Sequence, residues 1–386
     1  METDVTTICR LAIAAILTTT VYLAPSAWAA SFEPLFTEQR SYGYPLARVS
    51  NDGKVVVSHP GYGYRSTIWR ENTGLSNIGF GTGLNGLSGD GSTIVGSTYG
   101  IAGSGRAIVW QGPDGLRNSS RSTAMDVSID GGRVVGGSWS AGGAVQAIVW
   151  KEGLKHDLGG ITVGAVTSEA YAVSDDGSTI VGTSSDILWE SGSPRAQNPF
   201  VWDEEAGFRV LEDASGRSMP FGFARGVSAF GDYVVGQRNT GIDTQGFLWT
   251  RENGEVLLDD LPGSRKFGAA FAVSAYGNRI VGRGREVSGG NVSVAVIWDS
   301  QLTPKPLKGV LEDDYGLDLE GWTLRTATDI SADGRFIVGT GRGPDGLEYV
   351  WRAEIDAIPE PTALLISLTL VIAIIASRGN GRLLSV

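Results

Sequence analysis

A pattern of apolar and polar positions recurs seven times between about residue 46 and residue 351. Each copy has a four-residue strand segment that begins and ends with an aliphatic residue, then a serine, a glycine three residues later, an aliphatic pair and finally a tryptophan. The repeat serines are Ser50, Ser88, Ser128, Ser174, Ser228, Ser274 and Ser331. Short apolar runs between turn residues at regular spacing are typical of β-strands in a repeat protein. Each copy therefore predicts one small antiparallel sheet.

The copy at residues 170–211 shows the expected elements most clearly. Ala170–Val173 predicts an inner strand, Ile180-Val181 a second strand, the run ending at Trp202 a third, and Gly207–Leu211 a fourth. Five of the seven inner segments begin with alanine, and a small side chain fits where strands converge on a propeller axis. The sequence therefore predicts an all-β fold, a seven-bladed β-propeller of four-stranded antiparallel blades over residues 31–357.

The last blade needs a strand from the other end of the chain. No fourth strand follows Trp351, yet an unassigned apolar piece, Phe32–Phe36, precedes the first repeat. We expect this piece to complete the seventh blade and close the ring, which leaves no open sheet edge.

The turn after each serine contains an aspartate in five copies, and Phe230 and Tyr276 replace it in the other two. The glycine is present in all seven copies. A ring of calcium-binding or catalytic carboxylates would need its acids, whereas a turn needs only the glycine that adopts positive φ. We therefore interpret the motif as a turn. Another glycine follows the aliphatic pair in six copies, with Ser58 in its place in the first.

One tryptophan ends the third strand of every copy. These residues are Trp69, Trp110, Trp150, Trp202, Trp249, Trp298 and Trp351. Side chains at equivalent strand positions usually pack between sheets, and we expect that here. A ring of sugar-stacking indoles is the alternative.

The N-terminus predicts an export signal. An apolar run at residues 11–24 is followed by Pro25 and by Ala27-Trp28-Ala29, which is typical of signal peptide cleavage between Ala29 and Ala30. Residues 1–29 would then be removed. An uncleaved anchor is the alternative.

The C-terminus, residues 358–386, combines Pro359-Glu360-Pro361, an uncharged apolar run at residues 362–377, and the basic residues Arg378 and Arg382. A helix of this run would be roughly 24 Å long, a marginal span of a bilayer core of about 30 Å. The order of these three parts resembles the PEP-CTERM sorting signal of exported bacterial proteins. That resemblance implies a membrane-bound exosortase as partner, cutting near Pro359-Glu360-Pro361. A simple membrane anchor is the alternative.

Composition limits the chemistry. The formal charge is −11, and nucleic acid needs clustered basic residues, so we expect no nucleic-acid partner. Cys9 is the single cysteine and lies in the predicted signal peptide. The two histidines, His59 and His156, occupy non-equivalent positions, and we expect both in loops. The sequence predicts no catalytic residue, no metal site and no cofactor.

The copies differ most in two insertions, Ser184–Asn198 with Trp189 and Gln301–Arg325. The second insertion holds the candidate ligand loop, which consists of Glu312, Asp313, Asp314 and Trp322. Its carboxylates could bind calcium or act as a glycosidase pair, although their spacing misses the calcium-loop template. A solvated acidic loop is the alternative.

The repeat also resembles the HAF family of extracellular bacterial repeats, which pair a Gly-x-Val-Val-Gly segment with a His-Ala-Phe-x-Trp segment. The histidine of that pattern is absent from every copy, so no role of that residue is implied here. Its place is taken by Arg65, Arg106, Gln146, Asn198, Gln245, Val294 and Leu347.

The two terminal segments predict an exported protein that its C-terminal helix anchors in the membrane before processing. The resemblances to PEP-CTERM and HAF proteins imply a bacterial source and a location at the outer envelope, the cell surface or the extracellular matrix. We expect a non-catalytic binding or structural module with a polysaccharide or a surface protein as partner. The alternative is a carbohydrate-active enzyme, a glycosidase or lyase, that uses carboxylates at the propeller mouth.

Overall fold

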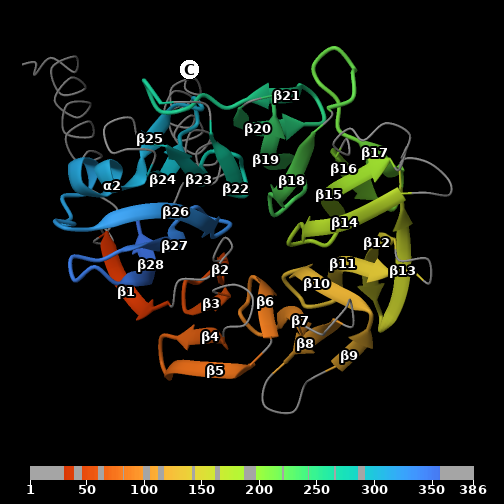
Figure 1. Ribbon diagram of the computed structural model, residues 1–386, viewed down its shortest axis with the longest axis horizontal. Helices are drawn as coiled ribbons and strands as arrows, with labels where there is room; N and C mark the ends of the chain where they lie inside the picture. The colour runs from red at the N-terminus through yellow and green to blue at the C-terminus, as the bar shows by residue number, and fades with distance from the viewer. Residues whose placement is uncertain are drawn as a thin grey trace, which may run out of the picture.

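The computed structural model describes residues 30–38, 46–59, 65–80, 82–98, 105–111, 117–140, 144–160, 166–186, 197–219, 221–241, 243–264, 267–285 and 292–356. These residues form seven four-stranded antiparallel sheets arranged as blades around a central axis (Figure 1). The sequence-based prediction of a seven-bladed β-propeller is therefore confirmed.

Each blade uses four strands, named from the axis outward. Blade 1 consists of β2 (Leu46–Val49), β3 (Val55–His59), β4 (Arg65–Arg70) and β5 (Gly74–Phe80). Blade 2 consists of β6 (Thr82–Leu87), β7 (Ile94–Thr98), β8 (Arg106–Trp110) and β9 (Arg117–Ser120). Blade 3 consists of β10 (Ser122–Val127), β11 (Arg133–Trp139), β12 (Val145–Lys151) and β13 (Leu154–Gly159). Blade 4 consists of β14 (Val166–Val173), β15 (Thr179–Asp186), β16 (Gln197–Asp203) and β17 (Gly207–Val210).

The remaining blades follow the same order. Blade 5 consists of β18 (Gly222–Val227), β19 (Tyr233–Asn239), β20 (Thr244–Thr250) and β21 (Gly254–Leu257). Blade 6 consists of β22 (Ala269–Val273), β23 (Ile280–Arg285), β24 (Ser293–Trp298) and β25 (Pro304–Pro306). Blade 7 consists of β26 (Thr323–Ile330), β27 (Phe336–Arg342), β28 (Glu348–Glu354) and β1 (Ser31–Thr37).

The repeat serine anchors the turn between the first two strands of each blade. Ser174, for example, is fully buried, and its hydroxyl donates to Asp176 over 2.6 Å and accepts the Thr179 amide over 3.0 Å. Gly177 closes the turn at φ +74°, a conformation in which a side chain would be strained. The aspartates therefore complete a turn, as the sequence indicated. The face of the ring that carries these seven turns is called the turn face below.

The glycine after the aliphatic pair accompanies a β-bulge in the inner strand. In blade 5 the pairing shifts between Ala224 and Gly226, and a Cβ added to Gly236 would lie 2.0 Å from the Phe223 carbonyl oxygen. Blade 1 has Ser58 at this position, and its inner pairing runs without a shift. The exception in the sequence therefore coincides with the one inner pair that lacks the bulge.

The tryptophans pack between neighbouring blades. Trp298 of blade 6 is fully buried and donates its indole N–H to the Asp259 carbonyl, directly after blade 5, over 2.9 Å. Trp249 of blade 5 makes the equivalent bond to the Glu212 carbonyl after blade 4. Trp69 of blade 1 lies in one hydrophobic cluster with Phe336 of blade 7. The expected packing role is therefore confirmed for these three residues.

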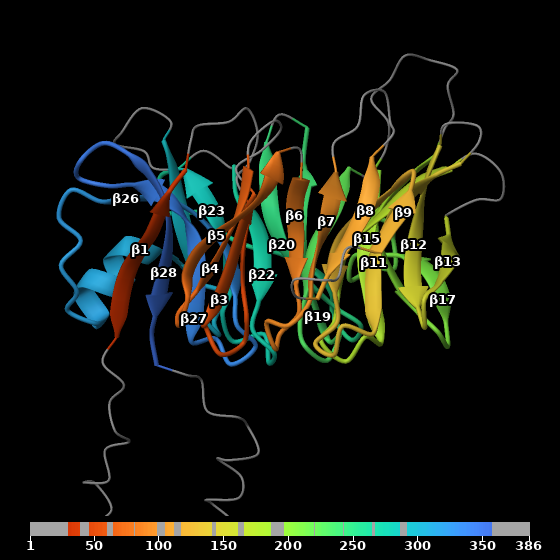
Figure 2. The same ribbon diagram turned by 90° about the horizontal axis from the view of Figure 1, so that it is seen from below.

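The N-terminal strand β1 closes the ring. It pairs antiparallel with β28, with Ser31 opposite Glu354 and Phe36 opposite Val350. Arg352 of β28 strengthens this seam, because its guanidinium contacts Glu33 at 3.0 Å and donates to the Gly53 carbonyl of blade 1. Seen from the side, the strands cross a flat disc, and the start of β1 lies beside the end of β28 (Figure 2).

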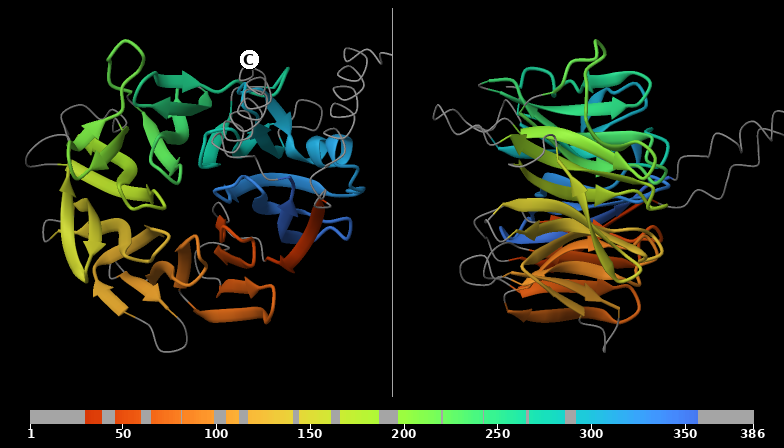
Figure 3. Two further views of the ribbon diagram at one scale, coloured as in Figure 1. Left: turned by 180° about the vertical axis from the view of Figure 1, so that it is seen from behind. Right: turned by 90° about the vertical axis from the view of Figure 1, so that its right-hand side faces the viewer.

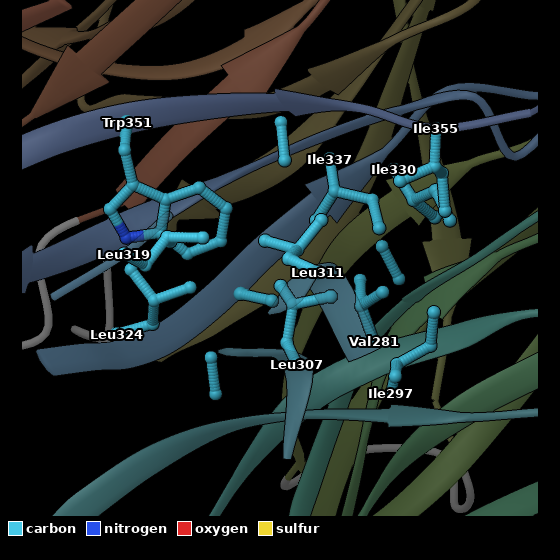
Figure 4. Packing of buried hydrophobic residues seen from close by; sticks show 14 residues of the cluster. Val281, Ile297, Leu307, Leu311, Leu319, Leu324, Ile330, Ile337, Trp351 and Ile355 are labelled. Carbon is cyan, nitrogen blue, oxygen red and sulfur yellow. The ribbon is translucent and has the colours of Figure 1, made fainter. Parts of the chain in front are cut away.

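The second insertion folds against blades 6 and 7. It forms a short helix, α2 (Leu307–Gly309), and a π-helical turn, η2 (Val310–Asp314), which lie on the outside of the ring in the left view of Figure 3. Leu307, Leu311 and Leu319 are fully buried in a cluster with Trp351 (Figure 4). Apolar packing therefore holds this segment in place.

Both predicted terminal segments fall outside the described residues. Ala29 belongs to the first, and the sorting residues Pro359, Glu360, Pro361, Arg378 and Arg382 with the apolar run at 362–377 belong to the second. Trp189 of the first insertion also lies outside the described residues. Neither helix in the described ranges is long and apolar enough to span a bilayer.

Candidate functional site

The inner strands of all seven blades surround a small cavity on the propeller axis. Its volume is about 90 Å³. The third residue of the four-residue inner segment lines its wall in six blades, and these residues are Arg48, Asp126, Ala172, Gly226, Ala272 and Asp329. Three of them are charged, so the axis has a polar interior.

Each axial carboxylate bridges to the next blade. Asp126 accepts the Val173 amide of blade 4 over 3.0 Å. Asp329 accepts the Val49 amide of blade 1 over 2.9 Å. The two acids therefore satisfy backbone donors that would otherwise lose a partner inside the ring.

The positive charge of Arg48 interacts favourably with both axial acids, Asp126 and Asp329. Its guanidinium is 3.9 Å from Asp329 and also donates to the Asn85 carbonyl over 3.1 Å. Burial raises the pKa of Asp126 to about 7, although Arg48 opposes that shift. Burial likewise raises the pKa of Asp329, and the nearby Asp175 adds to the rise. A raised carboxyl pKa is the property that a general acid needs.

A hydrogen bond spans the axis at the turn-face end of the cavity. The Asn51 side-chain amide of blade 1 donates to Asp175 of blade 4 over 3.0 Å. Asn51 also donates its backbone N–H to the Gly89 carbonyl and accepts the Ala332 amide. One residue, through its side chain and its backbone N–H, therefore links blades 1, 2, 4 and 7 at this end.

An arginine between aromatic rings lies farther from the turn face, on the inner strands of blades 4 and 5. The Arg225 guanidinium is 5.0 Å from the ring centre of Tyr171 and 4.7 Å from that of Phe223. Beside it, Glu169 accepts from Thr123 of blade 3, and burial raises the pKa of Glu169. This cluster ties three blades together by contacts among its own side chains.

The fold places the four residues of the candidate ligand loop in different surroundings. Glu312 pairs with Lys308 at 3.6 Å, Asp313 is exposed, and Asp314 faces a second cavity described below. Trp322 packs edge-on against Phe32, with ring centres 5.0 Å apart, and so supports the closing strand. The structure does not gather the four residues into one site. Among the described residues, no three His, Cys, Asp or Glu side chains are grouped to hold a metal ion.

The prediction that both histidines lie in loops is wrong. His59 ends β3 and His156 lies in β13. His59 is buried, and burial lowers its pKa to about 4, so its imidazole is neutral near pH 7.

Sequence reasoning missed the axial residues. The available signal was the third position of the inner segment, where charged residues stand in blades 1, 3 and 7 and small residues stand elsewhere. Only the closed ring brings these three positions together.

Comparison with solved structures supports the fold. The β-propeller domain of the Trilobed protease from Pyrococcus furiosus, described as having an open velcro topology, superposes with a TM-score of 0.54 at 10% identity over 83% of this chain and 100% of that one. Acylaminoacyl peptidase from Pyrococcus horikoshii gives a TM-score of 0.50 at 12% identity over 84% of this chain and 54% of that one. TolB from Acinetobacter baumannii gives 0.43 at 12% identity over 81% and 80%.

No protein-family model matches the sequence, and no curated protein is significantly similar to it. The two superpositions with TM-scores of 0.54 and 0.50 show a shared fold alone, because their identities are 10% and 12%.

Proposed function

We propose that this protein is an exported, non-catalytic binding or structural module of a bacterial cell surface or extracellular matrix. The proposal rests on the axial cavity, which is small and whose two acids are already hydrogen-bonded within the protein. Its two acids each accept a backbone amide of the next blade. The cavity of about 90 Å³ is also far smaller than the roughly 300–1,000 Å³ of typical ligand pockets. A sugar ring would have to break inter-blade hydrogen bonds to reach these carboxylates.

The two chain ends support the export part of the proposal. We propose that residues 1–29 are a signal peptide, which is cleaved between Ala29 and Ala30. We also propose that the C-terminal segment is a sorting signal, with the residues Pro359, Glu360, Pro361, Arg378 and Arg382. Fractionation of a bacterial host that expresses the full-length gene tests them. Recovery of an intact, uncleaved chain in the cytoplasm would contradict export.

A carbohydrate-active enzyme is the second candidate. The pKa of Asp126, raised to about 7 by burial, is the observation that favours it, because a protonated carboxyl can act as a general acid. A hydrolase and lyase panel on polysaccharides, run alongside a glycan array with the full-length protein, separates the two. Binding without turnover supports the module, whereas turnover that Asp126→Asn abolishes supports the enzyme.

A further inference from the structure

A second cavity, larger than the axial one, lies beside the insertion. We propose that it is a binding pocket for a neutral saccharide, one or two sugar units of a longer polysaccharide. The inference rests on the proposed function of a binding module and gives that function a site and a ligand class. The hollow is called the lateral pocket below, and its walls come from the β22–β23 turn, the end of β24, β25, the insertion and Ile355.

The size of the lateral pocket fits such a ligand. Its volume is about 400 Å³, within the roughly 300–1,000 Å³ range of small-molecule sites. It is more than four times larger than the axial cavity of about 90 Å³. Ligand-sized space is therefore found at the edge of the ring and not on its axis.

The walls are held by contacts that do not involve a ligand. The Arg279 guanidinium donates to the carbonyls of Gly334 over 2.8 Å and Asp356 over 2.6 Å, and it also hydrogen-bonds Tyr315. Leu307 and Leu311 anchor the insertion from behind. The pocket is thus pre-formed, which lowers the entropy cost of binding.

The chemistry of the lining points to a neutral polyol. Two basic side chains, Arg279 and Lys305, face two acidic ones, Asp299 and Asp314, so the formal charges cancel. An anion would meet both carboxylates and a cation both basic groups, and each such contact is unfavourable. A sugar hydroxyl can donate to the acids and accept from the basic groups at the same time.

The same lining offers a surface for the apolar face of a sugar ring. Ile297, Val310 and Ile355 supply aliphatic surface, and Tyr315 adds an aromatic ring. Apolar lining with a few convergent polar groups is the usual composition of small-molecule sites. Asp314 belongs to the candidate ligand loop, so part of that loop reaches a cavity of suitable size.

The test is calorimetric titration of the full-length protein with cellotriose, maltotriose, xylotriose and mannotriose, with trigalacturonic acid as a charged probe. Two pocket variants, Asp314→Ala and Ser300→Trp, remove a wall acceptor and fill the pocket from its β24 end. Asp313→Ala is the matched control, because this neighbouring acid is exposed and is not part of the lining.

We expect at least one neutral trisaccharide to bind, with at least tenfold weaker binding in both pocket variants and less than a twofold change in Asp313→Ala. Binding that both variants leave unchanged would overturn the pocket while leaving the binding module intact. Failure of every neutral probe, or tighter binding of trigalacturonic acid, would overturn the ligand class. Turnover of any polysaccharide by the wild type would instead overturn the proposed function.

Discussion

The axial cavity and the lateral pocket are built in opposite ways. Seven equivalent inner strands enclose the axis, and polar residues such as Asp126 and Asn51 there are bonded to other blades. The lateral pocket exists because one copy of the repeat carries extra residues between β25 and β26. The comparison shows that regular repetition fills the centre of this ring, whereas a departure from the repeat leaves room for a ligand.

Removal of the closing strand β1 should destabilise the ring more than any other change predicted below. Deletion of residues 30–37 exposes one edge of β28 and removes the buried Phe36 and the partly buried Phe32. Full burial of one such side chain contributes about 1.5–3 kcal/mol, so we expect a loss of about 3–6 kcal/mol. Thermal unfolding followed by circular dichroism measures it.

The control for this deletion is Glu33→Gln, which removes only the charge that faces Arg352. Glu33 is 47% exposed, so its ion pair should contribute less than about 1 kcal/mol. An unchanged melting temperature after the deletion would show that β1 does not close the ring.

The bulge glycines test how tightly the inner strands are fitted. Gly236→Ala would place a Cβ 2.0 Å from the Phe223 carbonyl oxygen, and we expect a loss of about 1–3 kcal/mol in denaturant unfolding. Gly246→Ala in the same blade is the matched control, because its nearest neighbours lie at an ordinary 3.4 Å. Equal stability of the two variants would mean that the bulge is not needed.

The pH dependence of stability tests the axial acids. Burial raises the pKa of folded Asp126 to about 7 from an ordinary value near 4, so the folded state holds a proton that the unfolded state releases. The free energy of unfolding from this group therefore falls as pH rises from about 4 to about 7. We expect Asp126→Asn to reduce that fall in urea titrations at several pH values.

Asp130, four residues away in the turn, should change the free energy of unfolding with pH in the opposite direction. Hydrogen bonds from Ser128 and from the Gly132 amide lower its pKa, so its contribution is present near neutral pH and is lost as the pH falls through that lowered value. An Asp130→Asn variant should therefore be less stable than wild type near pH 7, and this difference should shrink in acid, where wild type loses the same contribution. The same pH profile for both variants would contradict the assignment of Asp126 to a desolvated site.

Removal of the hydrogen bond between Asn51 and Asp175 across the axis should reduce stability the least. Asn51→Ala removes both the bond to Asp175 and the bond that Asn51 accepts from the Ala332 amide, and we expect a loss of about 1–2 kcal/mol. Asp313→Ala, in the insertion, should stay within about 0.5 kcal/mol of wild type because its side chain is exposed. Differential scanning calorimetry of both variants compares the two regions directly, and equal losses would remove the contrast between them.

Much of the ring could be predicted because its information is local and repeated. The serine, glycine, aliphatic pair and tryptophan of each copy specify one blade, and Phe32–Phe36 was the remaining strand. The axial acids were missed because Asp126 and Asp329 lie 203 residues apart, and only ring closure places both on the axis.

The insertion shows a different limit of sequence reasoning. Its acids and Trp322 look like one ligand loop, but the helical turn separates them. Trp322 turns to Phe32, Glu312 pairs with Lys308, and Asp314 reaches the lateral pocket. The burial of Leu307 and Leu311 against blades 6 and 7 decides this division, and a single sequence does not reveal such long-range packing.

The position of β28 has a mechanical consequence. This strand lies between β1 and β27 and ends on the turn face, where the Arg279 guanidinium holds the Asp356 carbonyl. A pull on the chain beyond residue 356 would act along β28 and load the hydrogen bonds on both of its edges in shear. Many bonds would then have to break together, so blade 7 would resist unfolding under such a force.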